Sequence, residues 1–129
     1  MSEKFTVEII TPDKTILKLD AIEVTIPSYE GQMGILKDHI PLITFLRPGF
    51  ILIKSQDDKK YYVEEGTVEF SNNNLLILTS TAKDLNNFDK GLIDSSLKAA
   101  EKKLQDSSLT DKEQYVESYK KDTLKEINQ

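Results

Sequence analysis

His39 is the one histidine in the 129 residues of this sequence, and it is the first residue to test for chemistry. Histidine is the commonest general base and metal ligand near neutral pH. A metal site needs several ligands, however, and nucleophilic catalysis needs a base beside a nucleophile. The nearest acid, Asp38, falls in an apparent turn, and the chain contains no cysteine. We therefore predict a structural or interface role for His39, and no catalytic residue, metal site or cofactor.

Three other residue patterns, formed by acids, by glycines and by lysines, could carry chemistry. The acid pairs Asp57-Asp58 and Glu64-Glu65 could perform acid and base catalysis on a β scaffold, but both adjoin predicted turns, where charged residues are usually solvated. The glycines match neither GxGxxG nor GxxxxGK[ST], so they indicate turns and bulges rather than a phosphate cradle. Three lysines near the end of the sequence could meet an acidic partner or form a solvated face. These are Lys120, Lys121 and Lys125.

The charge of the chain indicates which classes of binding partner are to be expected. There are 22 acids and 17 bases, giving a net charge of -5, and the bases are scattered along the chain. Nucleic acid and anionic lipid surfaces both require concentrated positive charge, so neither is an expected partner. The apolar runs are far shorter than the ~20 residues that a membrane-spanning helix requires. The first residues resemble a strand rather than a targeting segment, which predicts a cytosolic protein without a direct membrane span.

The first part of the chain has the period-two pattern of β-strands. Phe5, Val7 and Ile9 alternate with polar residues, and further short strands are separated by turn formers. Pro27 is expected to stop one of them, because proline lacks the donor that a strand interior uses. Many short strands at this spacing predict an antiparallel β-sandwich or flattened barrel over residues 1–83. The expected strands after Phe5 are 15–19, 22–26, 50–54, 61–64, 67–70 and 75–79.

The last part of the chain, residues 84–129, has helical periodicity. Ile93, Leu97, Ala100 and Leu104 recur at helical spacing, which predicts a helix over about 90–105 with Asp89 as its cap. Thr110 and Glu113 match a capping box that would begin a second helix reaching about residue 127. The short link between the two predicts an antiparallel α-helical hairpin.

The apolar stripes of this hairpin are narrow, and they leave two interpretations open. Each fully buried large apolar side chain contributes roughly 1.5 to 3 kcal/mol, whereas each ordered backbone residue costs roughly 1 to 2 kcal/mol. The hairpin should therefore depend on docking against another surface. It is either a movable element that exchanges docking surfaces or a permanently docked pair. The stripe of the second helix consists of Tyr115, Val116, Tyr119, Leu124 and Ile127.

The stretch from Tyr29 to Gly49 carries a recognisable pattern. It reads as a glycine-bearing turn, a short apolar strand, a second turn at Asp38 and His39, another apolar strand and a Pro-Gly turn. This pattern resembles the EGxxGIL-x-x-HxPLIT-x-L-x-PG signature of the epsilon subunit of F-type ATP synthases. The opening strand that ends in Thr11-Pro12-Asp13 is also similar to that family. The similarity continues through both expected helices.

The resemblance implies a β-sandwich bound to the gamma subunit at the foot of the central stalk, in contact with the membrane ring of c subunits. By this analogy Gly31, Gln32, Met33 and Gly34 would face the ring, and His39 and Leu42 would lie near gamma. Gln32 replaces the acid often found there, which leaves a hydrogen bond from its amide in place of a charge pair. The implied location is peripheral, on the cytoplasmic side of a bacterial inner membrane.

The resemblance also has implications for the helices. Some bacterial members bind ATP through an Ile-Asp-x-x-Arg motif, of which this chain keeps Ile93 and Asp94 but has Leu97 in place of the arginine. In the family the helical tail can insert between gamma and the catalytic alpha and beta subunits and oppose ATP hydrolysis. Lys120, Lys121 and Lys125 would be the basic residues in such contacts.

The leading hypothesis is a non-catalytic rotor subunit that couples ring rotation to ATP synthesis. One alternative is a free-standing β-sandwich ligand-binding module whose helical hairpin dimerises through Tyr115 and Tyr119. Another is a hydrolase centred on His39.

Overall fold

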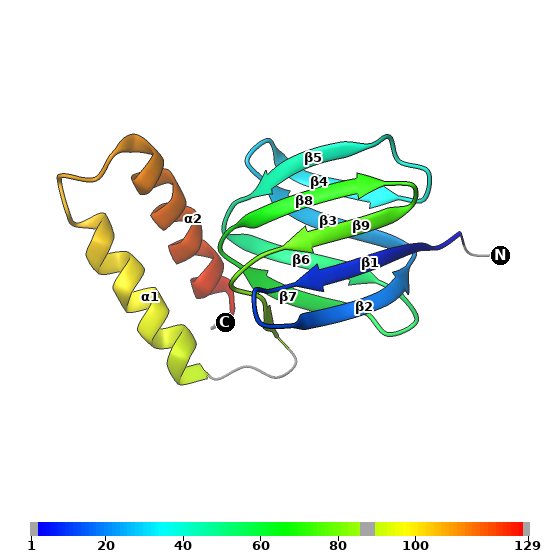
Figure 1. The fold of residues 1–129 in the computed structure, drawn as a ribbon. Helices are drawn as coiled ribbons and strands as arrows, with labels where there is room; N and C mark the ends of the chain where they lie inside the picture. The colour runs from blue at the N-terminus through cyan, green and yellow to red at the C-terminus, as the bar shows by residue number, and fades with distance from the viewer. Residues whose placement is uncertain (1–2, 86–89, 128–129) are drawn as a thin grey trace. The chain divides into compact units, whose positions relative to one another are not determined.

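The computed structural model describes residues 3–85 and 90–127, and the chain forms two compact units, residues 1–86 and 87–129. The first unit is a β-sandwich and the second is an antiparallel pair of helices (Figure 1). The predicted fold class is therefore confirmed. A short strand, β10 (Lys83–Asp84), spans the boundary predicted after residue 83 and pairs with β7 (Lys59–Val63), so the first unit reaches slightly further along the chain.

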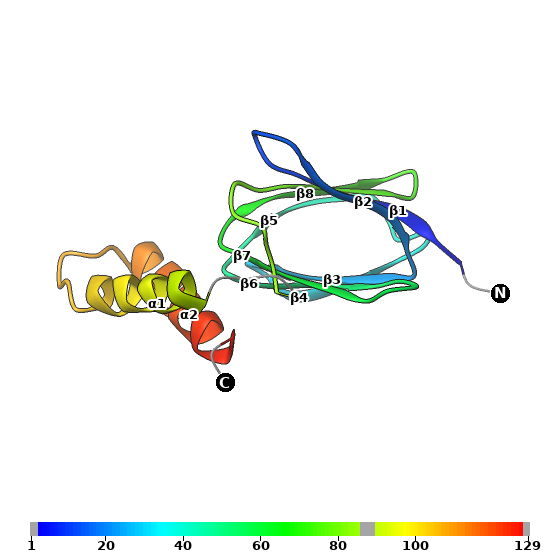
Figure 2. The same cartoon turned by 90° about the horizontal axis from the view of Figure 1, so that it is seen from below.

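The strands of the first unit follow one continuous hydrogen-bonded path that folds into two facing layers (Figure 2). One layer has the order β5-β8-β9-β1-β2, and the other has the order β10-β7-β6-β3 with β4 beside β3. The remaining strands are β1 (Phe5–Ile10), β2 (Thr15–Ala21), β3 (Glu23–Ser28), β4 (Gly31–Leu36), β5 (Leu42–Leu46), β6 (Gly49–Lys54), β8 (Gly66–Ser71) and β9 (Asn74–Leu78).

The core of the sandwich confirms the period-two prediction. Phe5, Val7 and Ile9 of β1 are all buried, and they pack with inward residues of both layers. Most neighbouring strands are antiparallel as predicted, but β1 and β9 run parallel. Because these two strands lie far apart in the sequence, no hairpin turn forces them into opposite directions.

Pro27 does not end its strand, contrary to the sequence prediction. β3 continues through Pro27 to Ser28, and Pro27 pairs with Gln32 of β4. The carbonyl of Pro27 instead accepts a hydrogen bond from the Arg47 amide at 3.0 Å, on the side facing away from β4. In a strand the N–H and C=O of one residue point the same way, so the missing donor is not one that the β3–β4 ladder uses.

The second unit consists of α1 (Lys90–Leu104) and α2 (Asp111–Ile127), which pack side by side in opposite directions (Figure 1). The predicted capping box is confirmed. Glu113 N–H donates to Thr110 Oγ1 at 3.1 Å, and Thr110 N–H donates to Glu113 Oε1 at 3.1 Å. The cap predicted at Asp89 lies outside the described residues.

The helices bury a smaller apolar surface than the sandwich does. Ile93, Ala100 and Leu124 are fully buried, whereas Tyr115 is 37% exposed and packs against the Tyr119 ring with centroids 4.7 Å apart. None of the described helices has the length and apolar character that crossing a membrane requires.

Gly66 provides a test of the sandwich geometry. Its φ of +154° favours glycine, and a Cβ there would lie 2.5 Å from the Leu78 carbonyl oxygen. Gly66→Ala should therefore lower the free energy of unfolding by about 2 kcal/mol or more, as measured by urea denaturation. Gly34→Ala is the matched control, because only Glu23 Oε2 approaches that position, at 3.7 Å, and its effect should stay within about 0.5 kcal/mol. Equal effects at the two glycines would contradict this geometry.

The capping box predicts a pH dependence for the start of α2. Hydrogen bonds from Thr110 lower the pKa of Glu113, so the folded helix favours the charged carboxylate. This contribution is complete above the unfolded-state pKa and is lost as the pH falls through the lowered folded-state pKa. The protection of the Glu113 amide against exchange, corrected for the pH dependence of the intrinsic rate, should therefore fall in acid. Glu113→Gln keeps an accepting oxygen but does not titrate, and its exchange should lack this acid transition.

Candidate protein interfaces

The β3–β4 turn is held by Ser28, whose side chain is completely buried. Its Oγ accepts a hydrogen bond from the Glu30 amide at 3.1 Å and donates one to the Gly31 carbonyl at 3.0 Å. Ser28 pairs with Gly31, so Tyr29 and Glu30 form the tip of a two-residue turn. Gly31 has a φ of +115°, which a glycine adopts without strain. The tip is therefore a closed, defined projection rather than a loose loop.

The four residues predicted to face a ring follow this tip in β4 rather than forming it. Gln32 and Gly34 are exposed, whereas Met33 packs against the sandwich core. Gly31 is half-buried at the start of the strand. The exposed surface at this end consequently includes Tyr29 and Glu30, which precede the predicted set.

The same turn is joined to the other layer beside β5. Arg47 Nε donates to the Ser28 carbonyl at 3.1 Å, and the Tyr29 amide donates to the Phe45 carbonyl at 3.3 Å. Ser28 also pairs with Leu46, which is the junction where the path of strands passes between the layers. Two interlayer contacts thus flank the turn.

At the opposite end of the sandwich, the β4–β5 loop is clamped to the β8–β9 turn. The Asp38 amide donates to Asn73 Oδ1 at 2.7 Å, and Asn73 Nδ2 donates to Asp38 Oδ1 at 3.0 Å. Both residues have left-handed backbones, with φ of 66° and 57°. Aspartate and asparagine tolerate that region better than most residues, which accounts for their use here.

His39 lies beside this clamp in a packing environment. Its ring meets Phe70 edge-on, with centroids 5.9 Å apart and planes at 89°. Nδ1 lies 2.7 Å from the Ile40 carbonyl, which can only accept, so Nδ1 is the donor. Leu42, the other predicted gamma-facing residue, is half-buried and packs against the core.

Strand β5 has an inverted pattern that the sequence analysis missed. Ile43 and Phe45 are 71% and 61% exposed, whereas Thr44 between them is buried.

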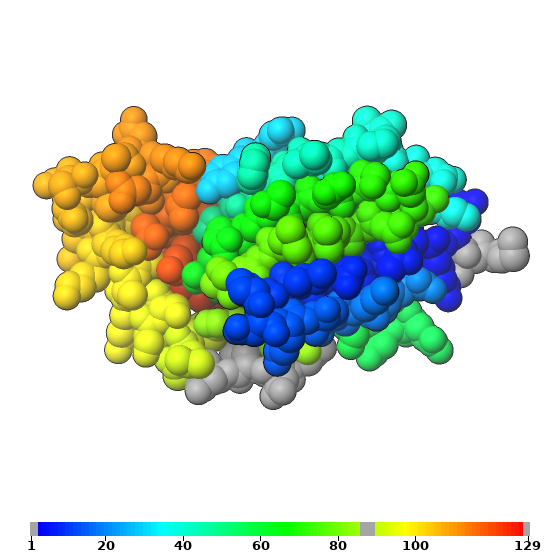
Figure 3. Space-filling model, viewed as in Figure 1, coloured from blue at the N-terminus to red at the C-terminus, as the bar shows by residue number. Residues whose placement is uncertain are grey.

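Register places Phe45 beside Thr67 and Thr67 beside Leu78, which is 44% exposed. Figure 3 shows the face of the sandwich formed by these strands and by β1 and β2. Ile43, Phe45 and Leu78 are called the outer apolar face below. The alternation along residues 42–46 was the available signal, but it does not say which side faces the core.

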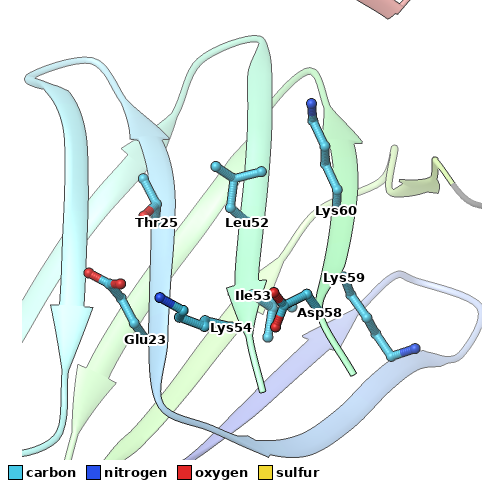
Figure 4. A pocket seen from close by; sticks show the side chains of 8 residues that line it. All are labelled: Glu23, Thr25, Leu52, Ile53, Lys54, Asp58, Lys59 and Lys60. Atoms are coloured by element: carbon cyan, nitrogen blue, oxygen red, sulfur yellow. The ribbon is translucent and has the colours of Figure 1, made fainter. Parts of the chain in front are cut away.

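The outer side of the other layer carries a groove of about 380 Å³ (Figure 4). Its lysines point in different directions and do not converge on one point: Lys54, Lys59 and Lys60. Lys60 Nζ lies 4.2 Å from the centroid of the Phe50 ring, and Lys59 Nζ lies 3.7 Å from Asp57 Oδ2. With Glu23 and Asp58 also on its walls, the groove offers mixed charge and no single ligand chemistry.

The predicted sites on the helices are spread over different faces. Ile93 is completely buried in α1, whereas Asp94 beside it is exposed. In α2, Lys121 and Lys125 are four residues apart and share one side, and Lys120 points about 100° away from Lys121. The three lysines thus do not form a single patch.

Within 3–85 and 90–127, no group of three or more His, Cys, Asp or Glu residues is placed to hold a metal ion. Burial raises the pKa of Tyr61, with a further contribution from Asp84. The smaller contribution from Asp84 follows from the β7–β10 pairing, in which these two residues are register partners.

Comparison with known sequences gives matches over nearly the whole chain. The family model "ATP synthase, Delta/Epsilon chain, beta-sandwich domain" matches residues 4–84. An ATP synthase epsilon chain of Pelagibacter ubique is 48% identical over 99% of this chain and 100% of its own length. An ATP synthase epsilon chain of Cyanothece is 36% identical, with 84% of this chain and 80% of that one covered.

Solved structures show the same fold at lower sequence identity. A chain in the Euglena gracilis mitochondrial ATP synthase, solved as OSCP/F1/c-ring, is 20% identical with a TM-score of 0.77. The match covers 98% of this chain and 82% of that one. A chain in the central stalk and c-ring of the Tetrahymena thermophila mitochondrial ATP synthase has a TM-score of 0.65 at 19% identity, covering 98% and 96%.

The Asp38–Asn73 clamp can be tested by a double-mutant cycle. The two side chains exchange hydrogen bonds, so Asp38→Ala and Asn73→Ala should show a coupling energy of about 1 kcal/mol in urea unfolding. The cycle removes the separate effects of each left-handed backbone. A control cycle pairs Asp38→Ala with Asn72→Ala, which also has a positive φ, and should be additive. Additivity in the first cycle would show that the clamp does not stabilise the fold.

Proposed function

Because the chain belongs to the ATP synthase delta/epsilon chain family, we propose that it is the non-catalytic central-stalk subunit of a proton-translocating F-type ATP synthase. In this role it couples rotation of the membrane ring to ATP synthesis in other subunits. The observation that supports this most strongly is the full-length similarity to an ATP synthase epsilon chain. We expect it to act on the cytoplasmic side of a bacterial inner membrane as a peripheral component.

The outer apolar face is the surface we assign to the gamma subunit. Ile43 and Phe45 expose most of their side chains, whereas Thr44 is buried. A strand with one face in solvent normally exposes its polar side chains and buries its apolar ones, so this pattern is reversed. Exposed apolar clusters of this kind mark interaction sites. Fully burying one such side chain contributes about 1.5–3 kcal/mol, so two supply a substantial part of a stable contact. Leu42 begins this strand and His39 lies in the loop before it, and we keep both in the proposed gamma-facing region.

The β3–β4 end is the surface we assign to the ring of c subunits. Gln32 and Gly34 are exposed there, and the Ser28 hydrogen bonds keep the tip in one conformation. A rigid polar tip suits contact with the polar loops of a ring. Met33 would contribute indirectly, by fixing β4 against the core.

The helical unit is the candidate regulatory element. We propose that it can oppose ATP hydrolysis by extending toward the catalytic alpha and beta subunits, with contacts from Lys120, Lys121 and Lys125. Their placement on two sides of α2 suits contacts with more than one chain. Nucleotide binding at Ile93 and Asp94 has less support, because Ile93 is buried and Leu97 stands in place of the arginine.

Binding to purified gamma subunit from the same source tests the proposed interface. Phe45→Ser should weaken that binding at least about tenfold, because it removes an apolar contact worth more than ~1.4 kcal/mol. Isothermal titration calorimetry would give the dissociation constant. The fold should tolerate the change, since Phe45 is 61% exposed in the free chain.

The matched control is Leu52→Ser, which replaces another exposed apolar side chain on a strand of the other layer. Its affinity for gamma should equal that of wild type. If both variants bind like wild type, the outer apolar face is not the gamma interface. If the wild-type chain does not bind gamma at all, the proposed rotor function loses its main support.

A further inference from the structure

Two proposed interfaces meet at the junction between β3 and β5. The ring-facing tip follows β3 directly, while the gamma-facing residues Ile43 and Phe45 lie on β5. A subunit that transmits torque must keep these two surfaces in a fixed relation. On the proposed function, on which this inference rests, one residue must maintain that relation.

Arg47 makes side-chain and main-chain contacts across this junction. Its Nε donates to the Ser28 carbonyl at 3.1 Å, and its amide donates to the Pro27 carbonyl at 3.0 Å. Its Nη1 also donates to the Pro48 carbonyl at 3.2 Å. The guanidinium therefore joins the end of β3 to the turn that leaves β5. Ser28 in turn holds the tip through Glu30 and Gly31.

The chemistry of arginine suits this position. A guanidinium presents several donors in a rigid plane, so it can reach two carbonyls of different segments at once. Lysine would place a single ammonium group on a flexible stem and could not reproduce that fork. Hydrogen bonds from a charged donor are also stronger than those between neutral groups.

Close packing leaves the junction little freedom to slide. A Cβ on Gly49 would lie 2.6 Å from Pro27 Cβ and 3.6 Å from Arg47 Nη1. The backbone after β5 therefore presses directly on β3. Leu46 and Ser28, which pair across the junction, are both almost completely buried.

We propose that Arg47 is a positioning residue for coupling: by holding the Ser28 carbonyl, it fixes the ring-facing tip relative to the gamma-facing strand. It does not itself contact the ring. Without its guanidinium only main-chain contacts, among them the hydrogen bond from the Tyr29 amide to the Phe45 carbonyl at 3.3 Å, still hold the tip against β5. The tip is then less firmly positioned, and part of the rotation is lost as slippage between the two interfaces.

Amide exchange on the isolated full-length chain tests the positioning part. In Arg47→Met the stem remains but the donors are lost, and the Tyr29 and Glu30 amides should exchange at least about tenfold faster, as expected from loss of a charge-assisted hydrogen bond. The Thr6 amide, which donates to Asn73 at the other end of the sandwich, should be unchanged. Lys18→Met is the matched control, since it removes one exposed cation from β2.

Coupling in the reconstituted complex tests the functional part. Complexes that contain Arg47→Met should pump fewer protons per ATP hydrolysed than wild type, although their affinity for gamma is unchanged. A residue with only a structural role would lower binding and stability together. Arg47→Lys keeps the charge and removes the fork, so it should reproduce both effects even if Arg47→Met folds poorly.

The outcomes separate this inference from the function on which it rests. If wild-type chain restores coupling and both Arg47 variants do so equally well, the positioning role is wrong while the proposed function stands. Unchanged exchange at Tyr29 and Glu30 in Arg47→Lys would also overturn it. If wild-type chain itself fails to restore coupling, the proposed function is wrong and the inference falls with it.

Discussion

The passage of the chain between two layers is the constraint on which this structure depends. A sandwich must join its layers somewhere, and here β3 and β5 meet through the pair Ser28 and Leu46. Proline is compatible with position 27 because its carbonyl accepts a hydrogen bond from the Arg47 amide. The N–H that proline lacks is not used by the β3–β4 ladder. Gly49 follows because no side chain fits against Pro27. The β3–β4 tip and the exposed side of β5 both take their positions from this junction.

The two units of the chain are stabilised by different kinds of interaction. The sandwich encloses a continuous core of buried apolar residues, and on one side it also exposes apolar side chains of β5. The helices bury few large side chains, and a capping box and loop hydrogen bonds define their ends. Such local interactions are individually small and solvent-exposed. The contrast is therefore between a well-packed sandwich and a helical unit with a marginal apolar core.

Much of the fold followed from local sequence patterns. Period-two alternation located the strands, and Thr110 with Glu113 marked the start of α2, because both signals act over a few residues. The parallel pairing of β1 with β9 was not predicted, since it depends on which distant strands meet. Pro27 was misjudged because the direction of its missing donor is a tertiary property.

The candidate sites were harder to predict for the same reason. The signature singled out residues 31–34 and His39, whose roles at the ring and at gamma stay predictions, but alternation along β5 cannot tell which side is solvated. Ile43 and Phe45 were recognised only when Thr44 proved to be buried. Arg47 carries no signal of its role in isolation, because the carbonyl it holds lies nineteen residues earlier in the chain.

Proton-driven ATP synthesis by a reconstituted complex tests the central claim most directly. The complex would be prepared without this chain, and the rate of ATP synthesis under an imposed proton gradient would be measured before and after the full-length chain is added. Restoration of synthesis on addition is the result that the account predicts. Equal rates with and without the chain would contradict its role as the coupling subunit.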